Sequence, residues 1–306
     1  EIDGVVQHGI GGRTTVPGVA AHWHSVHRGN ARHAVHDAIG VDLADEVSGE
    51  TLDAIKAALA EHLVLTFPDQ YLAPEDQKRV TRMFGEFGRE PFVRTMTDHP
   101  EIVEVIKDAT ETETVNFGGQ WHSDWSFQQA PPAMTLLHAK EIPPYGGDTL
   151  FCNMYRAYEM LSPGMRELLD GLTAIHSARR SYGLDSPIFG NARDKMTMKI
   201  DSTAEAHEET EHPAVITHPV TGRKGLFINA VYTTRFKDMT EAESHPILAF
   251  LQNHATNENN ICRVRWRPDQ LTIWDNRVTQ HFAMNDYDGH RRRLHRTTVR
   301  GDVPRN

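Results

Sequence analysis

A His-x-Asp tripeptide, His122-Ser123-Asp124, and a histidine about 160 residues downstream, His281, constrain this chain most. Residues two apart on an extended segment point to the same side, so His122 and Asp124 are able to bind one cation. With a second histidine they make a 2-His-1-carboxylate triad, which suits Fe(II) and leaves three positions free for a co-substrate and O2. The triad forms only if the fold brings distant strands side by side. For the tripeptide alone, the alternative is a structural pair in which a buried histidine hydrogen-bonds a carboxylate.

Composition excludes several classes of protein. The chain has 306 residues, of which 39% are hydrophobic and 24% charged, typical of a globular protein with a sizeable core. We find no apolar run near the roughly 20 residues of a membrane span. A net charge of −10 argues against a nucleic-acid partner, because phosphate binding requires a basic face. The two cysteines, Cys152 and Cys262, are too few for a disulfide scaffold and favour free thiols in the cytoplasm.

Hydrophobic periodicity predicts many short strands and a few helices. Apolar residues at three- and four-residue spacing predict a helix at 51–62, and Pro74 begins a second helix that ends before Gly85. Thr240 and Glu243 form a capping box for a late helix. Strand-like segments lie at 63–67, 102–106, 133–139, 214–217, 225–229, 262–266, 270–274 and 294–299. We expect a mainly β fold with flanking helices, a jelly roll, whose connections bring distant strands together.

The pattern predicts one domain over residues 36–306, preceded by an irregular arm. Residues 1–35 are rich in Gly and His and show no sustained period, with at most one short strand. Residues 183–212 are dominated by Gly, Pro, Asn, Asp and Glu. A loop of this length in a compact domain is typical of a lid or a disordered insertion, and we expect residues 183–212 to be a lid.

Three further residues, Thr149, Arg292 and Arg296, indicate no function when each is considered alone. Thr149 is typical of the start of a strand, and Arg292 and Arg296 are typical of a solvated basic stretch. However, an enzyme that uses a keto-dicarboxylate needs a planar, bidentate cation for the distal carboxylate, and Arg has this geometry. Arg292 and Arg296 are four residues apart in a predicted strand, so we expect them to share a face.

Four motifs together resemble one family: residues 121–124 (Trp-His-Ser-Asp), 146–150 (Gly-Gly-Asp-Thr-Leu), 229–235 (Asn-Ala-Val-Tyr-Thr-Thr-Arg) and 274–281 (Trp-Asp-Asn-Arg-Val-Thr-Gln-His). They are similar to motifs of the taurine dioxygenase/2,4-dichlorophenoxyacetate dioxygenase family, over residues of about 41–302. The resemblance implies an Fe(II)- and 2-oxoglutarate-dependent oxygenase on a double-stranded β-helix, a cupin-like jelly roll. It also implies a homodimer or homotetramer.

The resemblance assigns roles to individual residues. It implies that His122, Asp124 and His281 bind Fe(II), and that Thr149 and Arg292 bind the distal carboxylate of 2-oxoglutarate. Arg296 falls where relatives hold a substrate anion, and Tyr232 where an aromatic side chain lines the pocket.

Three positions depart from the taurine pattern. Glu90 and Val93 stand where taurine enzymes have a histidine and a tyrosine, and Gly118 replaces an asparagine. We therefore expect a larger or more apolar anion than taurine: an alkyl sulfonate, a sulfate ester or an aryloxyalkanoate. Alternatively, Glu90 binds a cationic group, which would favour an amino acid-like substrate.

The implied reaction is hydroxylation of a substrate carbon, coupled to conversion of 2-oxoglutarate and O2 to succinate and CO2. If that carbon bears a sulfonate, sulfate or ether oxygen, the product collapses to an aldehyde or ketone and the released group. A halogenase would need a small residue in place of Asp124, and no evident general base supports a hydrolytic zinc site. The non-enzymatic alternative is a jelly-roll binding protein with a vestigial site.

Overall fold

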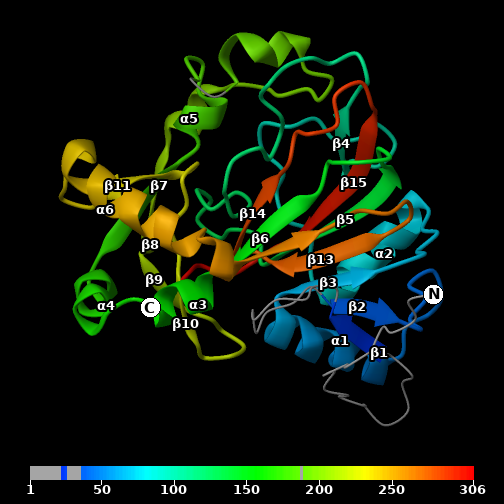
Figure 1. Ribbon diagram of the computed structural model, residues 1–306, viewed down its shortest axis with the longest axis horizontal. Helices are drawn as coiled ribbons and strands as arrows, with labels where there is room; N and C mark the ends of the chain where they lie inside the picture. Colours follow the sequence, from blue (N-terminus) through cyan, green and yellow to red (C-terminus); the bar gives the residue numbers. More distant parts are fainter. Residues whose placement is uncertain (1–21, 26–35, 187–188) are drawn as a thin grey trace, which may run out of the picture.

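The computed structural model describes residues 22–25, 36–186 and 189–306, and this part of the chain is mostly β-structure with helices, as the sequence predicts. Most of the predicted N-terminal arm, residues 1–35, lies outside these ranges. Its described part is β1 (His22–Ser25), which pairs antiparallel with β2 (His36–Ile39). Figure 1 shows both strands at one end of the largest sheet.

The largest sheet has seven strands in the order β1-β2-β3-β13-β5-β15-β4. Its other strands are β3 (Val64–Phe67), β13 (Leu271–Asp275), β5 (Met134–Glu141), β15 (Arg292–Val299) and β4 (Val103–Lys107). All neighbours are antiparallel except β2 and β3, which are parallel. Since β13 and β15 lie on either side of β5, C-terminal strands are inserted among strands from the first half of the chain (Figure 1).

Two helices pack against this sheet through one hydrophobic cluster. Helix α1 (Gly49–His62) begins at Ser48, whose side chain accepts a hydrogen bond from the Thr51 amide, and α2 (Pro74–Phe84) has proline at its first position. The Thr297 and Thr81 hydroxyls are hydrogen-bonded, so the odd-numbered positions of β15 face α2. Its even-numbered positions face the other side, where the candidate site lies.

Three smaller sheets complete the described β-structure: β12-β6-β14, β11-β7-β8 and β10-β9. Their strands are β6 (Thr149–Asn153), β7 (Thr173–Ser177), β8 (Glu209–Pro213), β9 (Val215–Thr217), β10 (Lys224–Leu226), β11 (Thr233–Phe236), β12 (Ile261–Val264) and β14 (Thr279–Ala283). The other helices are α3 (Met154–Glu159), α4 (Pro163–Asp170), α5 (Arg179–Tyr182) and α6 (Glu241–Ala255), with a 3-10 turn η3 (Glu258–Asn260). Thr240 and Glu243 cap α6 reciprocally, as predicted.

The segment 183–212 contains more regular structure than its composition indicates. It holds two 3-10 helices, η1 (Gly190–Lys195) and η2 (Ala204–His207), and most of strand β8. The expectation that its acidic end is a loop is wrong. Glu209 and Glu211 point outward and pair with Arg235 and Lys237, which lie across β7 on β11. Opposite charges on the two edge strands of this sheet, β8 and β11, therefore stabilise a strand that its own charge would disfavour.

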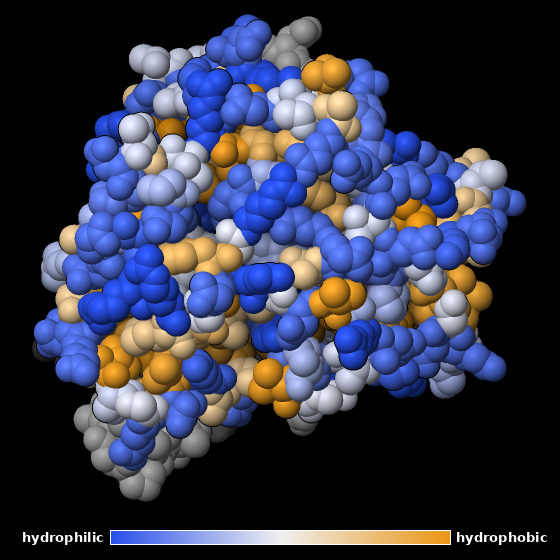
Figure 2. Space-filling view, turned by 180° about the vertical axis from the view of Figure 1, so that it is seen from behind, coloured by the Kyte–Doolittle hydropathy of each residue, from blue (hydrophilic) through white to orange (hydrophobic). Residues whose placement is uncertain are grey.

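Hydrophilic residues cover most of the face in Figure 2, and hydrophobic ones form small patches between them. Within the described ranges, no helix combines the length and the apolarity that a bilayer crossing requires.

Candidate active site

The two candidate histidines are adjacent because their backbones pair. The His122 amide donates to the His281 carbonyl at 3.1 Å, and the His281 amide donates to the His122 carbonyl at 2.8 Å. His281 lies on β14, so this isolated bridge attaches the loop of the His-x-Asp tripeptide to the sheet. The imidazole ring centroids are 4.1 Å apart. The backbone thus fixes the two histidines side by side.

Asp124 completes a compact, buried cluster with these histidines. One ligand atom from each residue lies within 4.8 Å of the other two. Asp124 Oδ1 is 3.6 Å from His122 Nε2 and 3.9 Å from His281 Nε2, which is too long for a hydrogen bond. Three buried donor atoms that converge without bonding one another suit a shared divalent cation. The structure therefore brings together all three residues predicted as ligands.

The protonation of the cluster also fits a metal. The Nδ1 atom of His122 is 2.6 Å from the Gln120 carbonyl, which holds the proton there and leaves Nε2 as the ligand atom. Burial and the nearby His122 lower the pKa of His281 to about 3, so its ring is neutral. Burial would raise the pKa of Asp124, but His281, Arg296 and His122 outweigh burial and hold it well below its usual range. The triad thus presents the Nε2 atom of His122, a neutral His281 ring and one carboxylate.

Two residues that the sequence analysis did not identify hold the Asp124 carboxylate. The Thr135 hydroxyl donates to Asp124 Oδ2 at 2.7 Å and accepts from Asn276 Nδ2 at 2.7 Å. The Asn276 carbonyl oxygen accepts in turn from the Trp274 indole at 2.9 Å. This chain of hydrogen bonds leaves Oδ1 facing the histidines. Asn276 lies within the motif at 274–281, so its role at the site could have been predicted from the sequence. Thr135 belongs to no motif, and nothing in the sequence distinguishes it from other strand residues.

Arg292 and Thr149, predicted to bind a carboxylate, lie around one indole ring. Arg292 is 5% exposed and its Nε donates to the Gly147 carbonyl at 3.1 Å, but its Nη2 has no hydrogen-bond partner in the described part of the chain. The Trp266 indole donates to the Thr149 hydroxyl at 3.0 Å, and its ring centroid lies 5.8 Å from the guanidinium carbon. Thr149 therefore keeps its own proton to donate. The Arg292 guanidinium and the Thr149 hydroxyl thus each have an unused hydrogen-bond donor. Such a pair fits a carboxylate group of a dicarboxylate such as 2-oxoglutarate.

Close packing at Gly147 supports this arrangement. Gly147 has φ +68°, and a Cβ there would lie 3.0 Å from both Cδ and Nε of Arg292. Any other residue at this position would be strained and would displace the Arg292 side chain.

A cavity of about 200 Å³ opens beside the metal cluster. His122 and Asp124 line it, and its walls include Val115, Phe117, Trp125, Tyr182, Phe189, Val231 and Tyr232. Burial raises the pKa of both the Tyr182 and the Tyr232 hydroxyls. Of the predicted substrate residues, Tyr232 and Gly118 line this cavity. Tyr182 comes from a segment to which the sequence analysis assigned no role, whereas Phe189 lies within residues 183–212, the predicted lid.

Glu90, Val93 and Arg296 lie behind the cavity wall. Val93 packs in a hydrophobic cluster with Trp125 and Tyr182. Glu90 and Arg296 form a buried ion pair, with 2.5 Å between Oε2 and Nη2. Of the five predicted substrate residues, two therefore line the cavity. The other three lie behind its wall.

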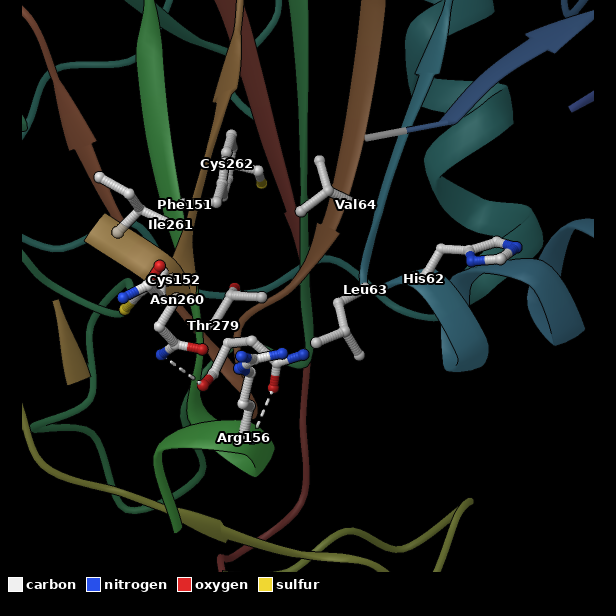
Figure 3. A pocket seen from close by; sticks show the side chains of 12 residues that line it. His62, Leu63, Val64, Phe151, Cys152, Arg156, Asn260, Ile261, Cys262 and Thr279 are labelled. Carbon is white, nitrogen blue, oxygen red and sulfur yellow. Dashed lines mark hydrogen bonds between the residues drawn. The ribbon is translucent and has the colours of Figure 1, made fainter. Parts of the chain in front are cut away.

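A second cavity, drawn in Figure 3, lies between the end of α1, β6 and β12. Leu63, Phe151, Cys152 and Arg156 are among its lining residues. Its volume of about 20 Å³ is close to that of a single water, so it does not compete as a substrate site.

The family described as "Taurine catabolism dioxygenase TauD, TfdA family" matches residues 29–298 of this chain. The chain belongs to this family. It is 34% identical, over 87% of its length and 86% of the relative's, to an α-ketoglutarate-dependent sulfate ester dioxygenase of Pseudomonas putida. It is 32% identical, over 86% and 93%, to the α-ketoglutarate-dependent 2,4-dichlorophenoxyacetate dioxygenase of Cupriavidus pinatubonensis.

Solved structures of TauD/TfdA relatives agree with this membership. A taurine dioxygenase from Burkholderia xenovorans superimposes with a TM-score of 0.74 at 30% identity, covering 90% of each chain. AAD-2 in complex with Mn(II) and N-oxalylglycine superimposes with a TM-score of 0.72 at 26% identity, covering 91% of this chain and 98% of AAD-2. The family prediction is confirmed, and the protein is a dioxygenase that uses Fe(II), 2-oxoglutarate (α-ketoglutarate) and O2.

Proposed function

We propose that this dioxygenase hydroxylates a small organic anion with an apolar body: an alkyl sulfonate, a sulfate ester or an aryloxyalkanoate. The observation that carries the proposal is the His122-Asp124-His281 cluster at the edge of an aromatic cavity. The names of relatives that act on sulfate esters, sulfonates and 2,4-dichlorophenoxyacetate support the substrate class. An amino acid-like substrate is the second candidate, because Glu90 lies near the cavity wall.

In this proposal, His122, Asp124 and His281 hold Fe(II), and Arg292 and Thr149 hold the distal carboxylate of 2-oxoglutarate. The bound iron and 2-oxoglutarate supply the oxidation of a substrate C–H bond by O2. Thr135 and Asn276 orient the Asp124 carboxylate, and the aromatic walls exclude water and position the reacting carbon. We propose that the strands form a double-stranded β-helix and that residues 36–306 form one domain. Residues 183–212 act as a lid, since Phe189 within them lines the cavity.

For a sulfate ester, hydroxylation of the carbon that bears the ester oxygen gives an unstable product. One atom of O2 enters that carbon and the other enters succinate, with loss of CO2. The C–O bond to sulfate then breaks, giving an aldehyde and free sulfate.

The test is O2-dependent succinate formation with Fe(II), ascorbate and each candidate anion. We expect one class to give stoichiometric succinate, together with sulfite, sulfate or a phenol. The Asp124→Ala variant is the control and should give no succinate. If neither the three anion classes nor amino acids stimulate succinate formation above the substrate-free rate, the proposed substrate class is wrong.

A further inference from the structure

The guanidinium of Arg296, at the position where relatives hold a substrate anion, already has an anionic partner in this chain. Its Nη2 lies 2.5 Å from Glu90 Oε2, and its Nη1 lies 3.4 Å from Asp124 Oδ1. The side chains of Arg296 and Glu90 are only 4% and 6% exposed. A charge pair at this distance, shielded from water, is much stronger than a surface pair.

The structure also fixes the Glu90 carboxylate from two other sides. The Trp125 indole donates to Oε2 at 2.8 Å, and the Thr298 hydroxyl donates to Oε1 at 2.8 Å. Gly88 allows this contact because the loop docks on β15, where a Cβ at Gly88 would lie 2.5 Å from Thr298 Oγ1. Glu90 is therefore held in place as the counter-ion of Arg296.

The ion pair lies against the wall of the cavity, and Arg296 Nη1 is 3.4 Å from Asp124, which also lines the cavity. Phe117 and Trp125 both line the cavity, and their ring centroids lie 5.2 and 5.1 Å from the Arg296 guanidinium carbon. Among the described residues that line the cavity, none is Lys or Arg. However, Arg296 Nε is buried and has no hydrogen-bond partner within the described ranges, so the guanidinium keeps an unused donor. An anion in the cavity therefore contacts aromatic side chains, and the charge of Arg296 behind them is already neutralised by Glu90.

We propose that Glu90 determines substrate specificity by competing with the substrate's anionic group for Arg296. This inference rests on the proposed function, an anion-hydroxylating dioxygenase. An anion either displaces the Glu90 carboxylate or shares Arg296 with it against like-charge repulsion. Both lower the affinity for the charged group, so binding depends more on the apolar body that fills the aromatic cavity. The site then selects aryl and long alkyl anions and rejects small, strongly hydrated ones.

Glu90→Gln tests this competition without removing the hydrogen bonds. The amide oxygen takes the place of Oε2 and accepts from Arg296 and Trp125, and the amide nitrogen donates to the Thr298 hydroxyl, which accepts as well as donates. Glu90→Asp retains the charge. The matched control is Glu86→Gln, which removes one negative charge from the same loop at an exposed position.

The probes are 2,4-dichlorophenoxyacetate, its uncharged amide and hexyl sulfate. Their dissociation constants are measured anaerobically on the Fe(II)·2-oxoglutarate protein, from the change in the visible charge-transfer band, and by tryptophan fluorescence with the metal omitted. We expect Glu90→Gln to bind both anions about ten- to a hundredfold more tightly than the wild type, the range of one charged hydrogen bond. The amide should bind all variants equally, and Glu86→Gln and Glu90→Asp should resemble the wild type.

Anion binding to Glu90→Gln but not to the wild type would also support the inference. Equal anion affinities in the two proteins, or a parallel gain for the amide, would overturn it. Failure of the proposed function would show earlier and separately, as a missing Fe(II)·2-oxoglutarate band before any probe is added.

Discussion

Replacing Arg292 by glutamine should separate the binding of 2-oxoglutarate from the stability of the fold. In glutamine the amide nitrogen is bonded to Cδ, as Nε is in arginine. The substitution therefore retains a donor for the Gly147 carbonyl and removes the distal part of the guanidinium, including the unpartnered Nη2. The matched control is Arg293→Gln on the opposite face of β15, where the partly exposed side chain pairs with Glu104.

The size of each effect follows from the burial of Arg292. Burial lowers the pKa of this guanidinium, so the charge opposes folding while it has no anionic partner. Without 2-oxoglutarate, Arg292→Gln should therefore be at least as stable as the wild type. With 2-oxoglutarate, loss of one partner of a buried charged pair costs about 2–5 kcal/mol. The dissociation constant should rise about 30-fold or more.

Thermal unfolding of the Mn(II)-loaded protein over a series of 2-oxoglutarate concentrations measures both quantities. At 100 times its dissociation constant, the co-substrate stabilises the wild type by about 2.7 kcal/mol. In Arg292→Gln the same concentration should contribute less than about 1 kcal/mol. A variant that loses stability without 2-oxoglutarate, yet still responds like the wild type, would show that Arg292 is structural. Arg293→Gln should retain the full response, because an exposed pair contributes little.

Three further outcomes follow from the structure. Thr135→Val removes the donor to Asp124, so the affinity for Fe(II) should fall about 10- to 100-fold in an anaerobic titration. An unchanged affinity would contradict the proposal that Thr135 orients the Asp124 carboxylate. Trp266→Phe removes the donor to Thr149, so the dissociation constant of 2-oxoglutarate should rise about two- to tenfold, while a larger loss would indicate a general collapse of the pocket. Burial lowers the pKa of both His138 and His295 to about 4, so the unfolded state binds more protons between about pH 4 and 6.5. Stability should be complete above pH 6.5 and fall by up to about 3 kcal/mol per histidine as the pH decreases to 4. Urea midpoints at pH 7 and 5 measure this loss, and His138→Gln should reduce it.

The sequence predicts the His122-Asp124-His281 cluster because its signal lies in residue types and positions. His122 and Asp124 are two residues apart in a segment predicted to be extended, so their side chains are expected on the same side. His281 joins them only through the fold, and the motif at residues 274–281 is what identifies it. Helices α1, α2 and α6 and strands such as β3, β5, β13 and β15 follow from caps and periodicity in the same way. The pairing of Glu90 with Arg296 is different, because it depends on how a loop approaches β15.

Strand β8 was missed for a related reason. Its acidic residues look like loop residues until the basic residues of β11 are placed across β7 from them. Such charge pairs become visible only when the order of the strands in the folded sheet is known. A single sequence therefore identifies the chemistry at this site better than the contacts that tune it.

Strand β15 carries both Arg292 and Arg296 and is hydrogen-bonded on both sides, to β4 and β5. At about 3.3 Å per residue, the two Cα atoms lie about 13 Å apart. With the roles proposed for these two residues, the strand is a rigid spacer between the 2-oxoglutarate carboxylate at Arg292 and the group that faces Arg296. Substitutions around the cavity change the body that fits, but they leave this spacing constant. Redesign for longer substrates therefore has to enlarge the aromatic side of the cavity, because β15 cannot lengthen.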